Sequence, residues 1–326
     1  MHRLLALLVA CILLAPLPAL AVTIQWSLVG NPGNADDPAD GDRFTAGVQN
    51  FGAVPYSYKI GTYDVTNRQY AEFLNTKDPG GANPLFLWNG NMDDGTRFGG
   101  INFNAGNPAG SKYVLVPGRQ DHPVNHVTWY SAIRFANWLN NGQGNGDTET
   151  GAYTLLGGTY TPTNGVSIVR NAGAQVFLPS ENEWYKAAYY NPATGSYFQY
   201  ATSSNGVPIA SGPTDLANHA NFGDFVANLT DVGAYTGTTS PYGAFDMNGN
   251  VFQWNQASID SFRGTRGGSW KLTLPDGMHS SDRFKLEPAN LLFNVGFRVA
   301  AVPEPSTLAL AALGALGLLI AARRRR

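Results

Sequence analysis

Cysteine is almost absent from the sequence. The 326 residues contain one, Cys11, and it lies in an N-terminal stretch that has the features of an export signal. A mature chain without thiols can form no disulfide, no thiolate metal site and no cysteine nucleophile. The first function classes to be excluded are therefore those that need sulfur ligands or a sulfur nucleophile.

Charged residues are also scarce. They make up 13% of the chain, about half of the roughly 25% usual in soluble domains, whereas glycine occurs 38 times. Lys and Arg total 21; without Arg3 and the four C-terminal arginines 16 remain against 23 Asp and Glu, so the body carries a net charge near −7. This balance argues against nucleic acid as a partner. With 43% hydrophobic residues, the composition favours a loop-rich domain with a true core.

The N-terminus predicts export. Arg3 precedes an apolar run over residues 4–14, and Ala19-Leu20-Ala21 fits a small-residue cleavage site. We expect residues 1–21 to be a signal peptide and the mature chain to start near Val22. An alternative is a lipoprotein box that ends at Cys11, although the apolar run continues past it.

The C-terminus predicts a membrane-associated tail. Residues 307–322 form an apolar stretch of 16 residues, which as a helix would be about 24 Å long, against a bilayer core of about 30 Å. Arg323 to Arg326 can snorkel and hold the end on the cytoplasmic side, with the body outside.

This tail resembles the PEP-CTERM sorting signal. Val302-Pro303-Glu304-Pro305 is followed by the apolar span and the basic end. The resemblance implies a bacterial exported protein whose tail is recognised by an exosortase-type membrane enzyme. It also implies a destination at the cell surface or in the medium, among bacteria that make exopolysaccharide.

Three helices can be predicted from caps and periodicity. Thr66 and Gln69 form a capping box, as do Ser180 and Glu183. Apolar residues at helical spacing predict a further helix over 129–139. Short strands are expected over the ranges 23–28, 177–178, 228–234, 264–270 and 295–301.

Six stretches occur in an order that resembles one family. They are YDVTNRQYAEFLN (63–75), DHPVNHVTWYSAIRFANWLN (121–140), LPSENEWYKAA (178–188), SPYGAFDMNGNVFQW (240–254), RGGSW (266–270) and NVGFRVA (294–300). Together they are similar to the formylglycine-generating enzymes, or sulfatase-modifying factor domains. The resemblance implies an α+β, C-type-lectin-like fold, loop-rich with few short helices and strands. We expect a signal peptide (1–21), an N-terminal strand and loop (22–54), this domain (55–301) and the sorting tail (302–326).

The segment after RGGSW bears on activity. Gly267 and Gly268 predict positive φ or a close backbone approach. In the family, two copper-binding cysteines follow this motif, and the positions that match them are Leu272 and a residue near Gly277. Copper(I) prefers thiolate and thioether ligands, so the sequence argues against copper and against formylglycine formation.

The resemblance also implies structural calcium. Asp246 would give a side-chain oxygen, Gly249 and Val251 backbone carbonyls, and Gln253 stands where a glutamate is usual. A second site would use Asn221 and the carbonyl of Phe222, with Asp224 as a helper. Calcium takes six to eight oxygen ligands, and their charge sets the affinity. The alternative is that these residues only make turns.

The histidines leave iron open. Iron-dependent oxidases occur in the same superfamily, but the separate His-rich helical domain of the sulfoxide synthases has no counterpart here. Pro123 interrupts the pair His122 and His126, which favours a loop. His219 and His279 could complete a three-histidine site only if the fold brought them together.

Three functions follow. The first is a non-catalytic surface module that binds an extracellular polysaccharide or a surface protein, with Trp270, Lys271, His279 and Arg283 as candidate ligand-binding residues. This reading expects Trp254 and Trp270 to be exposed for stacking on sugars, and Trp129 and Trp184 to be core. The second is a nonheme iron oxidase. The third is a purely structural surface protein.

Overall fold

The computed structural model describes residues 21–39, 49–93 and 98–303. The described helices are α2 (Asn67–Lys77), α3 (Trp129–Asn140) and α4 (Glu181–Tyr189), with 3-10 turns η2 (Gly165–Ser167) and η3 (Pro275–Met278). The described strands are β1 (Trp26–Val29), β2 (Tyr58–Gly61), β3 (Ile101–Phe103), β4 (Tyr113–Leu115), β5 (Val176–Phe177), β6 (Tyr190–Asn191), β7 (Ser196–Tyr197), β8 (Ile209–Ala210), β9 (His219–Ala220), β10 (Phe252–Ile259), β11 (Phe262–Arg266), β12 (Phe284–Leu286), β13 (Val295–Phe297) and β14 (Ala300–Ala301). The fold is α+β and loop-rich, as the sequence predicts.

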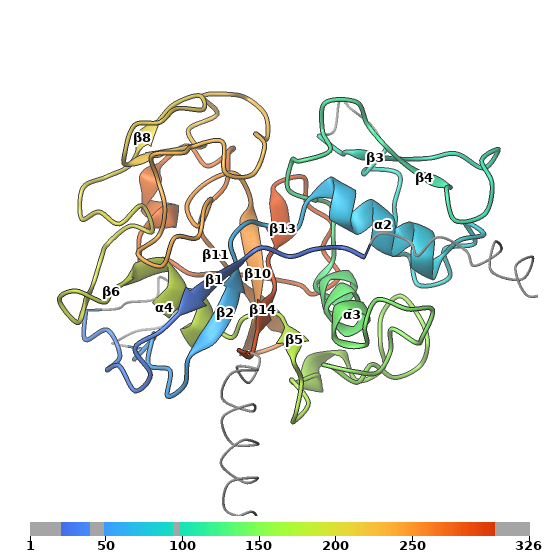
Figure 1. Ribbon diagram of the computed structural model, residues 1–326, viewed down its shortest axis with the longest axis horizontal. Helices are drawn as coiled ribbons and strands as arrows, with labels where there is room; N and C mark the ends of the chain where they lie inside the picture. The colour runs from blue at the N-terminus through green and yellow to red at the C-terminus, as the bar shows by residue number, and fades with distance from the viewer. Residues whose placement is uncertain (1–20, 40–48, 94–97, 304–326) are drawn as a thin grey trace, which may run out of the picture.

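Two small sheets occupy the centre of the molecule (Figure 1). One has the order β1-β2-β14-β5, and it joins the two ends of the domain because β2 pairs with both β1 and β14. The other has the order β12-β11-β10-β13, and in it β10 pairs antiparallel with β11 and parallel with β13. Helices α2 and α3 lie on one side of these sheets, and α4 with the loops around β8 lies on the other.

Helices α2 and α4 start where their caps predict, and α3 starts at Trp129, as its apolar periodicity predicts. Thr66 and Ser180 each accept a hydrogen bond from the backbone N–H three residues on, and both capping boxes are complete. Thr128 caps α3 in the same way, through the N–H of Ser131. Each cap satisfies N–H groups that have no partner inside the helix.

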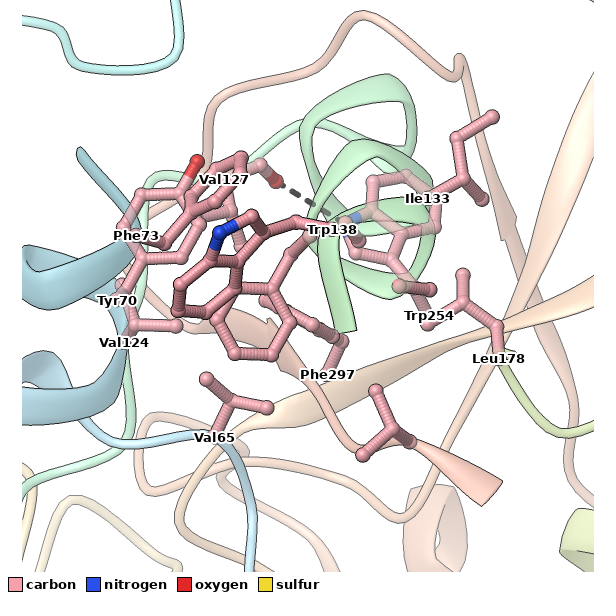
Figure 2. Packing of buried hydrophobic residues seen from close by; sticks show 14 of the residues in the cluster. Val65, Tyr70, Phe73, Val124, Val127, Ile133, Trp138, Leu178, Trp254 and Phe297 are labelled. Carbon is pink, nitrogen blue, oxygen red and sulfur yellow. Dashed lines mark hydrogen bonds between the residues drawn. The ribbon is translucent and has the colours of Figure 1, made fainter. Parts of the chain in front are cut away.

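An aromatic core joins α2 and α3 to the sheets. Tyr70 and Phe73 on α2 pack against Phe297 and Trp138, as Figure 2 shows. In the same cluster Trp254 donates from Nε1 to the carbonyl of Val127 over 3.0 Å, the dashed line in Figure 2. A buried indole with its N–H satisfied contributes both area and direction to the core.

Some expected elements differ. The stretch 228–234 forms turns and no strand; instead Asn250 fixes it by accepting from the N–H of Thr230 and donating to its carbonyl, at 3.1 Å each. The expected strand at 264–270 ends at Arg266 because Gly267 and Gly268 turn the chain. Within the described residues no helix is long and apolar enough to cross a membrane. The expected signal peptide and apolar tail lie almost wholly outside the described ranges.

Candidate functional site

Two glycines shape the start of the segment 266–284, which we name the closed segment. Gly267 has φ of 98° and Gly268 φ of 73°, so both occupy the region that favours glycine. A Cβ on Gly267 would lie 2.7 Å from the carbonyl oxygen of Met247, and one on Gly268 would lie 2.5 Å from Cγ of Met278. Both predicted reasons for glycine, positive φ and close approach, are present.

The side chain of Leu272 packs directly against Gly277. A Cβ at residue 277 would lie 2.8 Å from Cδ2 and 3.2 Å from Cδ1 of Leu272. The two positions matched to copper-binding cysteines are therefore neighbours in space, and an isobutyl group fills the gap between them. A hydrocarbon offers no lone pair, so the residues present do not fit copper(I).

The two tryptophans expected on the surface are buried, and that expectation is wrong. Trp254 is fully buried in the core, and Trp270 is 1% exposed. Trp270 packs against Phe98 and Phe293, with ring centroids at 4.7 Å and 5.6 Å. These rings cover its indole, so it offers no face to a sugar. Trp129 and Trp184 are fully buried, as expected.

The other three candidate ligand-binding residues point to different partners. Lys271 forms an ion pair with Asp224 at the surface. His279 is half-buried, and its Nδ1 lies 2.8 Å from the hydroxyl of Ser281. Arg283 is buried, with its guanidinium 4.9 Å from the ring centroid of Phe51. Of the three, Lys271 is the one with an exposed side chain.

Arg266 fixes the far end of the closed segment. Its guanidinium is fully buried, pairs with Glu181, and donates over 2.8 Å to the carbonyls of Ser280 and Asp282. Each donation satisfies a backbone oxygen in a loop with no regular structure. The closed segment is thus held by one buried cation at its base and by Leu272 at its surface.

The first expected calcium set is occupied by protein donors. Oε1 of Gln253 accepts from Nε1 of Trp184 over 2.8 Å and from Nε of Arg298 over 2.7 Å. Its Nε2 donates to the carbonyl of Asp246 over 2.7 Å. A calcium ion at Gln253 would have to displace both donors, so this amide does not fit as a ligand in the arrangement described.

Asp64, which the sequence analysis overlooked, joins the same network. It lies 3.0 Å from the guanidinium of Arg298, and both side chains are fully buried. Burial raises the pKa of Asp64 to about 7, although the cation opposes the shift. Burial likewise raises the pKa of Asp246 to about 6. Two carboxyls thus share one cation, and each is easier to protonate than in water.

The second expected calcium set fits better. Oδ1 of Asn221 is buried and accepts no hydrogen bond, and the same holds for Oδ1 of Asp224. The carbonyl of Phe222 accepts from the N–H of Phe225 over 3.3 Å. Buried oxygens without donors are costly unless something satisfies them, and a hard cation takes such ligands.

The histidines do not gather. No group of three His, Cys, Asp or Glu side chains suited to a metal ion occurs in the described ranges. His122 lies 3.6 Å from Asp231, whereas His219 contacts Ser211 and His279 contacts Ser281. His126 sits in a loop with φ of 54°, in agreement with the predicted loop.

A hollow that the sequence analysis overlooked lies on another side. This acidic groove has a volume of about 710 Å³ and is lined by residues 21–25, 63–66, 68–69, 72, 121, 231–232 and 299. The one local signal in this part of the sequence is the capping box of Thr66 and Gln69, which predicts a helix start and no groove. The lining comes from segments far apart in the chain, so no spacing could reveal it.

Comparisons with known proteins support the resemblance. The model of the sulfatase-modifying factor enzyme 1-like domain matches residues 37–302, and that of the PEP-CTERM protein-sorting motif matches 301–326. The solved structure of Treponema denticola variable protein 1 has a TM-score of 0.54 at 19% identity, over 86% of this chain and 96% of the other. CarF has a TM-score of 0.52 at 20% identity, over 86% and 99%.

The matches to curated relatives cover a smaller share of each chain. Hercynine oxygenase of Mycobacterium tuberculosis is 26% identical over 64% of this chain and 39% of its own length. The serine/threonine-protein kinase pkn1 of Chlamydia pneumoniae is 27% identical over 58% and 25%. This chain therefore spans at most about two fifths of these relatives, which share the domain and differ in name. The PEP-CTERM motif marks the chain for export, sorting by exosortase and surface anchoring. By its matched residues, its fold and its motif order, the chain belongs to the sulfatase-modifying factor enzyme 1-like domain family.

Proposed function

We propose that the chain is an exported, non-catalytic binding module, which uses the sulfatase-modifying factor scaffold to hold a glycan or protein at the cell surface. The observation that carries this proposal is Leu272 over Gly277. At the two positions where the resemblance implies copper-binding thiolates, this chain has only the hydrocarbon side chain of Leu272 and a glycine. A fold hosts many functions, and the function has to be argued from the site.

A structural calcium ion belongs to the same proposal. Asn221 and Asp224 supply buried oxygens without donors, and the carbonyl of Phe222 is the third oxygen of the set. The ion would order the loop that lies against the closed segment, where Gly223 donates to the carbonyl of Leu272 over 2.7 Å. Without disulfides, a loop-rich domain gains much from such an ion.

An oxidase is the second candidate, because relatives named hercynine oxygenase share the domain. Against it, the described residues contain no group of three His, Cys, Asp or Glu side chains suited to a metal ion. Stoichiometric iron in the purified protein, measured by elemental analysis, would favour the oxidase. Calcium without iron would favour the binding module.

The direct test is binding to the producing cells. Every described helix and strand lies within 26–301, so a chain of residues 22–302 contains the whole described fold. Labelled protein is added to cells that lack the gene, with excess unlabelled protein as competitor. We expect saturable, competed binding, and treatment of the cells with protease or glycosidase then separates a protein ligand from a glycan. Binding that never saturates would leave only the structural role.

A further inference from the structure

The acidic groove is bordered by three separate parts of the chain. Residues 22–25 form one wall; Gln69 donates to the carbonyl of Thr23 over 3.0 Å, and Gln25 accepts from the N–H of Thr62 over 2.8 Å. The first turns of α2 form the second wall, and the loop at Asp231 forms the third. At about 710 Å³ the groove is within the usual range of ligand sites, roughly 300–1,000 Å³.

Negative charge in this groove is poorly compensated. Glu72 makes no ion pair with a described residue. Asp231 has His122 at 3.6 Å, but burial lowers the pKa of that imidazole, so at neutral pH it is uncharged. Asp121 is paired with Arg68 at 3.2 Å. Two of the three carboxylates on the walls, those of Glu72 and Asp231, therefore have no charged side chain as a partner among the described residues.

Asp64 is a buried carboxyl with its own cation. It lines the groove, its side chain is fully buried, and its Oδ1 lies 3.0 Å from Nη2 of Arg298. Its one counter-charge, Arg298, also donates over 2.8 Å to the carbonyls of Gly61 and Phe245. Because burial raises the pKa of Asp64 to about 7, a cation bound in the groove above it would favour the ionised form of this carboxyl.

The remaining lining is mixed, with aliphatic side chains among polar ones. Ile24 and Val232, both partly exposed, contribute apolar surface between the acidic groups, whereas Val65 and Val299 are buried beneath it. The methylene stems of Lys and Arg pack on such surface while their heads reach carboxylates. A sugar is usually held by stacking on an open aromatic face, but the one aromatic side chain in the described lining, Tyr63, stacks on Phe245 with ring centroids 5.3 Å apart. The lining thus favours a basic peptide over an amino sugar.

We propose that the acidic groove binds an extended polypeptide segment that bears Lys or Arg, supplied by a partner protein at the cell surface. The inference rests on the proposed binding role and names the class of ligand at this groove. Glu72 and Asp231 would contact the cationic heads, and Ile24 and Val232 would contact the stems.

The test measures binding of a labelled pentapeptide, AKARA, to the 22–302 chain by fluorescence anisotropy at low ionic strength. The groove variant is Glu72→Gln with Asp231→Asn. The control variant is Asp215→Asn with Glu287→Gln, which removes two exposed carboxylates outside the groove. Both variants change net charge equally, and melting temperatures check that both fold.

We expect the groove variant to bind AKARA about tenfold more weakly than the unmodified chain, because two exposed ion pairs are each worth up to about 1 kcal/mol. The control variant should stay within about twofold, and AQAQA should not bind. Equal weakening by both variants would overturn the inference, because it would show a general charge effect. Tighter binding of spermidine or of a glucosamine trimer than of AKARA would overturn the peptide assignment.

Failure here can be told from failure of the proposed function. If the chain still binds cells saturably but does not bind AKARA, the groove inference is wrong and the binding role stands. If it binds neither, both are wrong. If the groove variant loses AKARA and protease-sensitive cell binding together, the groove is the site of that binding.

Discussion

The closed segment and the acidic groove differ in whether side chains fill the space at the protein surface. In the closed segment, Leu272 fills the gap above Gly277 and Arg266 fixes the loop from below. In the groove, Glu72 and Asp231 leave charge exposed around an open volume. At the positions matched to the copper-binding cysteines this chain has packed side chains, whereas the acidic groove keeps an open volume.

The two regions also differ in the interactions that stabilise them. The closed segment depends on a buried ion pair and on glycines whose conformation other residues rarely adopt. The groove walls carry solvated charges, which contribute little to stability. Substitutions should therefore affect stability in the first region and binding in the second.

The largest effect on stability is expected from Arg266→Ala. It leaves the Glu181 carboxylate, 11% exposed, without its cation and strips the carbonyls of Ser280 and Asp282 of donors. Breaking a buried pair from one side costs about 3–5 kcal/mol. Lys285→Ala, which removes an exposed pair with Asp260, should cost at most about 1 kcal/mol. Urea unfolding measures both, and similar costs would contradict the comparison.

The next largest effect on stability is expected from calcium binding to the loop that packs against the closed segment. At about 100 times its dissociation constant the ion would add about 2.7 kcal/mol, so chelator should lower the melting temperature. Asn221→Asp keeps an oxygen at the position and should retain the response, whereas Asn221→Leu should abolish it. A melt that ignores chelator in the unmodified chain would rule out the ion.

Gly268→Ala separates crowding from backbone strain. Gly268 and Gly110 have φ of 73° and 79°, but a Cβ on Gly110 meets no atom within 4 Å. Both Ala variants place a side chain in an unfavourable conformation, at about 1 kcal/mol. Only the variant at 268 also meets Met278 and Leu272, which adds about 1–3 kcal/mol of overpacking. Equal unfolding free energies would show that the closed segment has room.

The pH dependence tests the carboxyl under the groove. Because the pKa of Asp64 is raised to about 7, the folded chain keeps a proton that the unfolded chain loses above about pH 4. Stability from this group is full below about pH 4, falls by about 1.4 kcal/mol per pH unit, and levels off above about pH 7.

Asp64→Asn removes the contribution of this carboxyl to the pH dependence of the unfolding free energy. Relative to the unmodified chain, the variant should gain stability as pH rises from 5 to 8, as measured by urea unfolding at each pH. Asp260→Asn, at a side chain 79% exposed, is the control and should give a parallel curve. Parallel curves for both variants would mean that Asp64 titrates normally.

The sequence predicted what is local. Thr66 with Gln69 and Ser180 with Glu183 mark helix starts through contacts three residues apart, and Gly267 and Gly268 are needed for reasons visible in one turn. Motif order gave the fold, because each motif occupies a fixed place in a known family.

Burial and long-range pairing were beyond prediction. Trp270 is covered by two rings. Phe98 precedes it in the chain by more than half of the domain, and Phe293 follows it after a shorter interval. The pair of Asp64 with Arg298 spans almost the whole domain. Which aromatic is covered and which carboxylate is buried depends on packing among distant segments, and a single sequence carries no signal for it.

The most direct test of the central claim is a formylglycine assay on the purified 22–302 chain. A cysteine-containing sulfatase peptide is incubated with the chain, copper and oxygen, and the product is counted by mass spectrometry against copper without protein. Because Leu272 occupies the position of a thiolate, we predict no product above that control. Formylglycine above the control would contradict the account of this chain as a binding module without the family's oxidation chemistry.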